Sequence, residues 1–304
     1  MIKLLTVIIP VRDREKEIIR LLDGIGSQTL DRVSVLVVDN ASADSTAAVV
    51  REWISRHDGI DIRLISCNEP GAAYARNAGL AMAETPFVMF FDSDDEMAPG
   101  MIHQVTDYLS RHPSAQILGW DVDNQHRDGS RHISKFPTRR FLQNHLVHGC
   151  LSTVRYACST ALVRRAGGWN QNLKGWDDLE LGVRLLLLRP EIHLLPAKKP
   201  QVKINYTENS ITGLRYSDAP EKWESALDSI EETLRCGAPS MTSWITYRRA
   251  ILAADYETEG DTDNAVRLFN RAVADDPFLA RTVFTLHRHF HRGSWIAAAL
   301  IINF

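Results

Sequence analysis

The first 120 residues alternate between short apolar runs and segments whose apolar side chains recur at a helical spacing. The apolar runs predict strands at 4–9, 33–38, 61–66, 87–91 and 115–120. The helical spacing predicts helices at 14–27, from about 44 to 54, and at 72–84. Strands that alternate with helices favour a mostly parallel α/β sheet with helices on both faces and right-handed crossovers.

The pattern changes in the second half of the chain. The spacing of apolar residues is irregular between 121 and 160. Further along, it predicts a helix at 177–188 and strands at 192–195 and 200–206. From about residue 219 onward only helices are indicated. We therefore expect an α/β domain over 1–213 and an all-helical region over 214–304.

The helical region contains a segment that resembles one tetratricopeptide repeat. Residues 251–277 have small residues at the usual spacing, Gly260 between the two helices and Pro277 at the end. This suggests a tetratricopeptide-like hairpin at 244–277. An ordinary helical hairpin is the alternative, because a single repeat has no neighbours against which to bury its faces.

Charge, cysteine spacing and apolar length exclude several classes of protein. The net charge is −3, which gives no basic field for nucleic acid. The four cysteines lack a CxxC spacing, so neither a zinc site nor a disulfide framework is indicated, and a reducing compartment fits. No run reaches the roughly 18–20 apolar residues of a membrane span, and the N-terminus does not read as a signal peptide. The expected location is the cytoplasm.

Residues with functional potential lie at the carboxyl ends of three predicted strands. Pro10, Arg12 and Asp13 follow the first, Asp39 ends the second, and Asp92 follows the fourth. In open α/β sheets ligands bind beyond the carboxyl ends of the strands, so these groups should face one crevice.

The segment "FFDSDDE" (90–96) places four acids within five positions. Clustered carboxylates repel one another, and a hard divalent cation removes that cost. Asp92 and Asp94 therefore suggest a site for a metal and a diphosphate. The alternative is a solvated acidic turn that caps a helix starting near Pro99.

Four segments occur in an order and spacing that resemble a known family: "TVIIPVRDREKEIIRLLDGIGSQT", "VLVVDNASADST", "NEPGAAYARNAGLAMAETPFVMFFDSDD" and "GGWNQNLKGWDDLELGVRLL". Together they look like a family 2 glycosyltransferase with the GT-A (Rossmann-like) fold, over roughly residues 3–213. The resemblance implies an inverting, metal-dependent enzyme that moves a sugar from a nucleotide-diphosphate sugar, most commonly a UDP-sugar, to an acceptor hydroxyl. Surface polysaccharide or glycoconjugate synthesis is the expected context.

The resemblance also implies roles for individual residues on the donor side. Those matched to nucleotide binding are Pro10, Arg12, Asp13, Asp39, Gly71, Arg76, Asn77, Asp92 and Ser93. Asp94, with Asp92, matches the ligands of a Mn²⁺ or Mg²⁺ ion. Ser42, Asp44 and Thr46 complete a family motif, although capping of the next helix explains them as well.

On the acceptor side, Asp178 matches the family's general base and Asp177 its supporting acid. A helix N-terminus favours the anionic form of such a carboxylate, although the two acids could instead only cap the helix. Trp176 is the candidate for stacking on an acceptor sugar, whereas Trp120 and Trp169 are equally suited to core packing. The chain has Thr207 where many members have a metal-binding histidine.

The last predicted helices carry Arg and His among apolar residues, and residues 278–304 contain no acid. This segment could lie on an anionic membrane, which would suit a lipid-linked glycan acceptor. Packing on the body of the protein or on a partner in a homo-dimer is the alternative.

Two other functions compete with a catalytic transferase. One is a catalytically degenerate binding or scaffold protein that acts through its helical region. The other is a nucleotidyltransferase, which would need a glycine-rich loop that "IIPVRDRE" lacks. The Q/R-x-x-R-W motif of processive family members is also missing, so transfer of a single sugar is expected.

Overall fold

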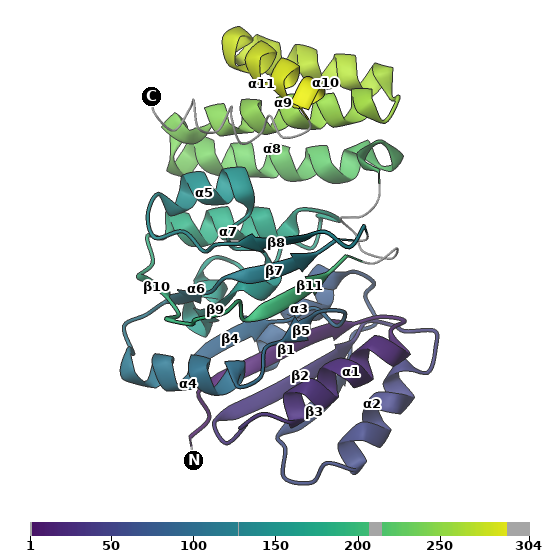
Figure 1. Cartoon of the computed structure of the whole chain (residues 1–304), viewed down its shortest axis with the longest axis vertical. Helices are drawn as coiled ribbons and strands as arrows, with labels where there is room; N and C mark the ends of the chain where they lie inside the picture. Colours follow the sequence, from purple (N-terminus) through teal and green to yellow (C-terminus); the bar gives the residue numbers. More distant parts are fainter. Residues whose placement is uncertain (1, 127, 207–214, 291–304) are drawn as a thin grey trace. The chain divides into compact units, whose positions relative to one another are not determined.

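The structure is a computed structural model that describes residues 2–126, 128–206 and 215–290 (Figure 1). Its residues divide into two compact units. The first comprises Met1–Arg139, Cys150–Asn172 and Leu188–Thr207, and the second comprises Arg140–Gly149, Leu173–Leu187 and Glu208–Phe304. Each unit is described by itself below.

The first unit is built on a seven-stranded sheet. Its order is β10-β6-β9-β4-β1-β2-β3, with bounds of Ile192–Leu194, Ile117–Gly119, Tyr156–Ser159, Phe87–Phe90, Leu5–Val11, Val33–Asp39 and Ile62–Ser66. Strands β1 to β4 pair in parallel, and β9 is the only described strand of this sheet that runs antiparallel to its neighbours, β4 and β6. The mostly parallel α/β sheet predicted from the sequence is therefore confirmed.

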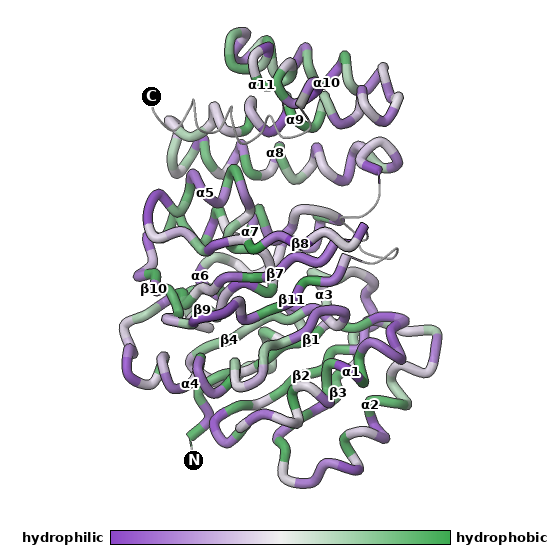
Figure 2. Tube along the Cα trace, in the orientation of Figure 1, coloured by the Kyte–Doolittle hydropathy of each residue, from purple (hydrophilic) through white to green (hydrophobic). Residues whose placement is uncertain are grey.

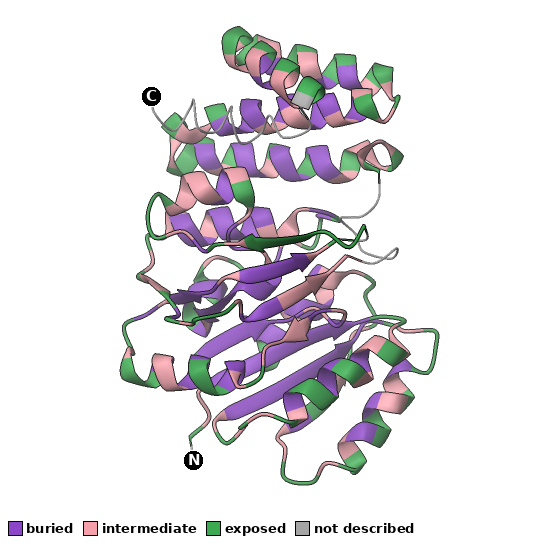
Figure 3. Ribbon diagram, viewed as in Figure 1, coloured by how far each residue is buried: buried purple, intermediate pink, exposed green. Residues whose placement is uncertain are grey.

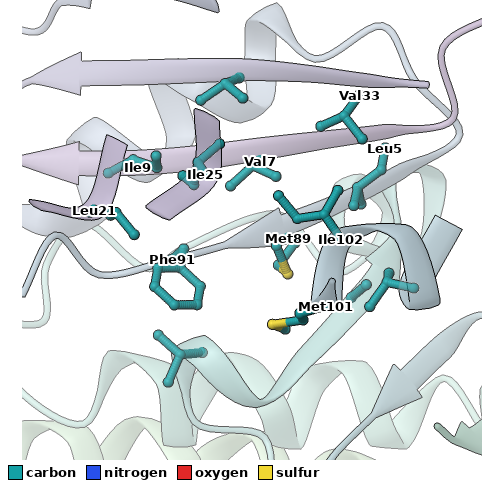
Figure 4. Close-up of a cluster of buried hydrophobic side chains, with 14 of the residues drawn as sticks. Leu5, Val7, Ile9, Leu21, Ile25, Val33, Met89, Phe91, Met101 and Ile102 are labelled. Atoms are coloured by element: carbon teal, nitrogen blue, oxygen red, sulfur yellow. The ribbon is translucent and has the colours of Figure 1, made fainter. Parts of the chain in front are cut away.

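Helices cover both faces of this sheet, as predicted. On one face Leu5, Val7 and Ile9 pack with side chains of α1 (Glu15–Gly26) and α4 (Met101–Arg111) (Figure 4). On the other face lies α3 (Ala72–Met82), where Gly79 approaches the strands so closely that a Cβ would lie 2.4 Å from the Ile8 side chain. Figure 2 shows that β1 and β2 are apolar along most of their length.

A second, four-stranded sheet completes the first unit. Its order is β5-β11-β7-β8, with bounds of Glu96–Met97, Val202–Asn205, Val122–Gln125 and Arg131–Ser134. Unlike β1 and β2, strand β8 is largely exposed (Figure 3). The sequence analysis assigned no strand to β7, β8 or β9, because these strands are short and carry no long apolar run.

The second unit consists of helices in its described part. They are α5 (Phe141–His148), α7 (Asp177–Leu187), α8 (Pro220–Gly237), α9 (Ser243–Thr258), α10 (Thr262–Asp275) and α11 (Pro277–Phe290). Trp223, Leu227 and Ile230 of α8 share a core with Tyr247 of α9 and Leu179 of α7. Helices α5 and α7 thus pack with the C-terminal helices, although the residues of both fall within 1–213, the range predicted for the α/β domain. The domain boundary at 213/214 stays a prediction.

The segment predicted as a hairpin at 244–277 corresponds to α9 and α10. The two helices pack along each other, and Gly260, with a φ of +89°, lies in the turn between them. Its likeness to a tetratricopeptide repeat stays a prediction. Within the described ranges, no helix has both the length and the apolar character needed to cross a bilayer.

Candidate functional site

The carboxyl ends of β4, β1 and β2 lie side by side, because the three strands are adjacent and parallel. Asp39 is the last residue of β2 and pairs with Val11, the last residue of β1. Asp92 follows the end of β4 by two residues. This topology brings the polar strand ends to one edge of the sheet, as the sequence predicted.

Asp39 is buried at this edge, with 8% of its surface exposed. Its Oδ1 atom is shielded from solvent and has no hydrogen-bond partner among the described residues. A buried carboxylate oxygen without a donor is costly. The geometry therefore leaves one strong acceptor available to an N–H or O–H group of a ligand.

The next residue, Asn40, fixes the loop that precedes α3. Its Nδ2 donates to the carbonyls of Cys67 and Glu69, and its Oδ1 accepts a hydrogen bond of 2.7 Å from the N–H of Gly71. Gly71 has a φ of +137°, which an L side chain rarely adopts. The sequence analysis did not single out Asn40, because its partners lie about thirty residues away along the chain.

Asp13 joins the loops that follow β1 and β2. Its N–H donates to the Ser42 hydroxyl, and its Oδ1 accepts from the N–H of Ala43 at 2.7 Å. The Nε of Arg12 lies 3.5 Å from the other carboxylate oxygen of Asp13. Both residues are exposed, whereas Pro10 is buried within β1. These contacts hold the two strand-end loops together.

Asp44 and Thr46 contact each other at the start of α2 (Thr46–Ser55). The Asp44 carboxylate accepts hydrogen bonds from both the N–H and the hydroxyl of Thr46. The bond from the Thr46 hydroxyl keeps the pKa of Asp44 below its usual value. This is the helix-capping role that the sequence left open as the alternative.

The acidic turn after β4 is not a solvated cap. Ser93 and Asp95 are buried, and Asp92, Asp94 and Glu96 are partly buried. The N-cap residue of α4 is Gly100, and no side chain makes a capping hydrogen bond there. The N–H of Ile102, in the first turn of α4, donates to the side chain of Gln28 and not to one of these acids. The capping interpretation of these acids is therefore wrong.

Three of the described arginines contact the acidic turn, and one of them, Arg20, donates from Nη2 to the backbone carbonyl of Asp94 at 3.0 Å. The Nη2 of Arg76 donates to Asp92 Oδ1 at 2.9 Å, and the Nη2 of Arg14 lies 3.4 Å from Asp94 Oδ2. Burial and the nearby charge of Asp92 raise the pKa values of Asp94 and Asp95, while Arg14 opposes the rise at Asp94. The sequence analysis did not single out Arg14, because its partner Asp94 follows a different strand, β4.

These residues fit a divalent cation that shares its ligands with a substrate. The described residues contain no group of three or more Asp, Glu, His or Cys side chains that could hold a metal ion alone. Mg²⁺ is commonly held by one or two carboxylates together with phosphate oxygens. Asp92 and Asp94 supply such a pair, and the burial and nearby charge that raise the pKa of Asp94 favour a positive charge beside it.

Arg76 and Asn77 lie on α3 beside Trp169. The guanidinium of Arg76, which is 6% exposed, lies 4.3 Å from the centre of the Trp169 ring. Trp169 and Trp120 are both buried, which confirms core packing for these two tryptophans. Asn77 exchanges two hydrogen bonds with the backbone of Trp169.

Asp177 and Asp178 belong to the second compact unit, where they open α7. Asp178 is partly buried, and its Oδ1 accepts from the N–H of Leu179 at 2.7 Å. Trp176 precedes them with a φ of +49°, and its ring contacts Tyr216 and Trp223. Both acids lie in the first turn of α7, where the sequence analysis expected a helix to begin.

Some predicted features lie outside the described residues. Thr207, with Ser210 and Thr212, falls in the range 207–214, and the end of the basic segment falls in 291–304. The described part of that segment is α11.

Comparisons with known proteins agree with this architecture. The sequence model of a family described as "Glycosyl transferase family 2" matches residues 6–167, which is more than half of the chain. The teichoic acid poly(glycerol phosphate) polymerase of Staphylococcus epidermidis is 34% identical over 108 residues, which are 35% of this chain and 14% of that protein. The poly(ribitol-phosphate) beta-N-acetylglucosaminyltransferase TarS of Staphylococcus aureus is 30% identical over 115 residues, which are 37% and 20%.

Two solved structures share the fold over most of the chain. TarS 1–349 in complex with UDP-GlcNAc has a TM-score of 0.62 at 19% identity and covers 94% of this chain and 91% of that one. The mannosyltransferase PcManGT from Pyrobaculum calidifontis, in complex with GDP-Man and Mn²⁺, has a TM-score of 0.60 at 20% identity, with coverage of 99% and 87%. The curated relatives above are matched over a fifth of their length or less.

Proposed function

Because the chain belongs to glycosyl transferase family 2 and has the GT-A fold, we propose that it is an inverting glycosyltransferase. It moves one sugar from a nucleotide-diphosphate sugar, which we take to be a UDP-sugar as is most common in the family, to a hydroxyl of a glycan or lipid-linked glycan. Its relatives include a teichoic acid poly(glycerol phosphate) polymerase and a poly(ribitol-phosphate) beta-N-acetylglucosaminyltransferase, and this supports a role in surface polysaccharide synthesis.

The observation that carries this proposal is the buried Oδ1 atom of Asp39, which no described group satisfies. It lies at the carboxyl end of β2, where a nucleotide base would bring an N–H donor. Asn40 holds the following loop through Gly71, so the approach to Asp39 is shaped by fixed backbone. Arg12, Asp13 and Pro10 would line the base from β1.

The acidic turn is the proposed binding site for the diphosphate of the donor. Asp94 and Asp92 would hold Mn²⁺ or Mg²⁺, which as a bound Lewis acid stabilises the charge that develops on the departing diphosphate. Arg76, already paired with Asp92, adds a fixed positive charge near this turn. Ser93 and Asp95 are the buried residues of this turn, and Asp95 Oδ1 anchors it by accepting from the N–H of Asn205.

Asp178 is the proposed general base. Its carboxylate would accept the proton of the acceptor hydroxyl as that oxygen attacks the anomeric carbon and the diphosphate leaves. A single displacement of this kind inverts the anomeric configuration. Asp177 supports the local negative charge, and Trp176 offers a ring face to an acceptor sugar.

The degenerate scaffold is the weaker candidate, because the acids of the strand ends and of α7 are all retained. The basic segment 278–304 remains our candidate for a peripheral contact with a membrane or for a homo-dimer interface. Flotation with anionic lipid vesicles would test the former.

The proposed function is tested by calorimetric titration of UDP, GDP and dTDP, each with and without Mn²⁺. We expect metal-dependent binding of one nucleotide to the wild type and its loss in Asp94→Asn. Asp107→Asn, which changes an exposed carboxylate on α4, serves as the matched control. Failure of all three nucleotides to bind would contradict the proposal and favour the scaffold.

A further inference from the structure

The turn that leads into α7 has an unusual backbone. Trp176 has a φ of +49°, a left-handed conformation that is rare and strained for a bulky side chain. Its carbonyl nevertheless accepts the first hydrogen bond of the helix, from the N–H of Glu180. The direction in which Asp177 and Asp178 leave the turn therefore depends on contacts that hold Trp176 in place.

Contacts from α8 supply part of this support. The Trp176 ring lies 5.2 Å from the ring of Trp223, and a Cβ on Gly175 would lie 2.8 Å from the same ring. The backbone at position 175 therefore lies so close to α8 that no side chain would fit there. The Nζ of Lys222 lies 4.4 Å from the centre of the Trp223 ring, on the same helix.

Arg248 of α9 supplies the other part. Its guanidinium lies 5.4 Å from the centre of the Trp176 ring. Its Nε donates to the Leu146 carbonyl at 2.5 Å and its Nη2 to the Val147 carbonyl at 3.3 Å. These carbonyls end α5, where a cation is favoured by the helix dipole. Burial lowers the pKa of Arg248, and Tyr247, Tyr216 and Asp178 oppose this effect.

Helix α5 is in turn fixed against α7. The Nε2 of His145 lies 2.9 Å from the Leu179 carbonyl, one residue beyond Asp178. A Cβ on Gly182 would lie 2.1 Å from the same nitrogen, so the His145 ring packs directly against the backbone of α7. Arg248 therefore connects the turn before α7 with the helix that packs against the first turn of α7.

We infer that Arg248 is a positioning residue for the Asp177–Asp178 pair: it holds the strained Trp176 turn and thereby fixes the first turn of α7. This inference rests on the proposed role of Asp178 in catalysis. It assigns the C-terminal helices a part in the reaction, because Arg248 contacts the Trp176 ring from α9. A planar guanidinium that spans two carbonyls and a ring face is not replaced by an ammonium group.

Arg248→Met, Arg248→Lys and Arg249→Met of the full chain form the test set. Arg249 is the next residue of α9 and is buried against Asp228, Glu231 and Asp275, so its loss destabilises the helices without touching Trp176. Hydrogen exchange of a peptide spanning 174–182 is measured without any ligand, with peptides of α10 as reference.

We expect Arg248→Met to speed exchange in 174–182 by about tenfold or more relative to the reference peptides, with Arg248→Lys between it and the wild type. Turnover should fall by about 10–100-fold, as for a misplaced catalytic group, with an unchanged KM for the nucleotide sugar. Arg249→Met should slow turnover only in proportion to its unfolded fraction.

Wild-type exchange and turnover in Arg248→Met would overturn the inference, as would equal losses in Arg249→Met. Failure of the proposed function is distinguishable. If Asp178→Asn keeps full turnover while Arg248→Met still loosens 174–182, then the role of Asp178 is wrong and the structural part of the inference stands.

Discussion

Asn77 and Trp169 exchange two hydrogen bonds although they lie 92 residues apart in the chain. The Asn77 Nδ2 donates to the Trp169 carbonyl at 2.8 Å, and its Oδ1 accepts from the Trp169 N–H at 2.9 Å. Gly168 has a φ of +70°, and a Cβ there would lie 2.7 Å from the Asn77 Oδ1. Both ends of the Asn77 amide thus bind the loop that carries Trp169, beneath the guanidinium of Arg76.

Asn77→Ala should therefore cost stability. It leaves the N–H and the carbonyl of a buried residue without their partners, so we expect the free energy of unfolding to fall by about 2–3 kcal/mol. Urea denaturation of the full chain measures this. Asn170→Ala is the control, because among the described residues its side chain bonds to the N–H of Asn172, two positions away.

An Asn77→Ala variant as stable as the control would contradict this structural role. In that case the role near the nucleotide, which the sequence resemblance implied, would gain weight.

Asp39→Asn should weaken nucleotide binding with little effect on stability. The substitution removes the charge of the buried Oδ1 atom that we assign to the base. Loss of a hydrogen bond to a charged group corresponds to an affinity about 10–100-fold lower. Calorimetry with the nucleotide that binds the wild type measures it.

Asp61→Asn is the matched control for that experiment. Asp61 precedes β3 and therefore lies at the opposite ends of the strands, where Ser34 donates to it. If the two variants bind the nucleotide equally well, Asp39 does not contact the base.

The sequence predicted the main sheet well because its signals are strong and local. β1 and β2 are buried along their whole length and read as continuous apolar runs. β8 is short, polar and exposed for most of its length, and β9 has only four residues, so neither produces a periodic pattern. Their positions depend on strand pairing that a local pattern cannot show.

The residues of the candidate site likewise fall into those that the sequence predicted and those that it did not. The acids at the strand ends could be predicted, because parallel strands bring their carboxyl ends to one edge. Arg14, Asn40 and Arg248 could not, since each acts through partners that only the folded chain brings near. For the same reason the grouping of α7 with the C-terminal helices was not anticipated.

The four cysteines should divide into two classes of reactivity. Burial raises the pKa of Cys150 to about 12 and also raises the pKa of Cys158. Cys236 is exposed and Cys67 partly exposed. Because the thiolate is the nucleophile, iodoacetamide at pH 8 should label Cys67 and Cys236 in the folded chain and all four in urea. Mass spectrometry of the peptides reads out the labelling.

The same shifts predict a loss of stability in alkali. The folded state favours the neutral thiol of Cys150, so its contribution is complete below the unfolded pKa of 9.0 and decreases as pH rises toward about 12. Cys150→Ser should flatten the fall in unfolding free energy over this range. Cys236→Ser should not, because that thiol is exposed.

Asp178→Asn should separate catalysis from folding. The Asn Oδ1 can still accept from the N–H of Leu179, so the start of α7 should be retained and the melting temperature should change little. The amide cannot take a proton from an acceptor hydroxyl, so turnover should fall by about 10²–10⁴-fold. Donor affinity should be unchanged, since the nucleotide contacts that we propose lie at the ends of β1, β2 and β4.

Glu180→Gln is the control on the same helix. Glu180 is 3% exposed and accepts two hydrogen bonds from Arg184, so its loss should lower stability and leave the turnover of the folded fraction intact. Steady-state kinetics and thermal unfolding of the two variants should therefore give opposite patterns. Wild-type turnover in Asp178→Asn would remove Asp178 as the base and leave Asp177 as the carboxylate to replace next.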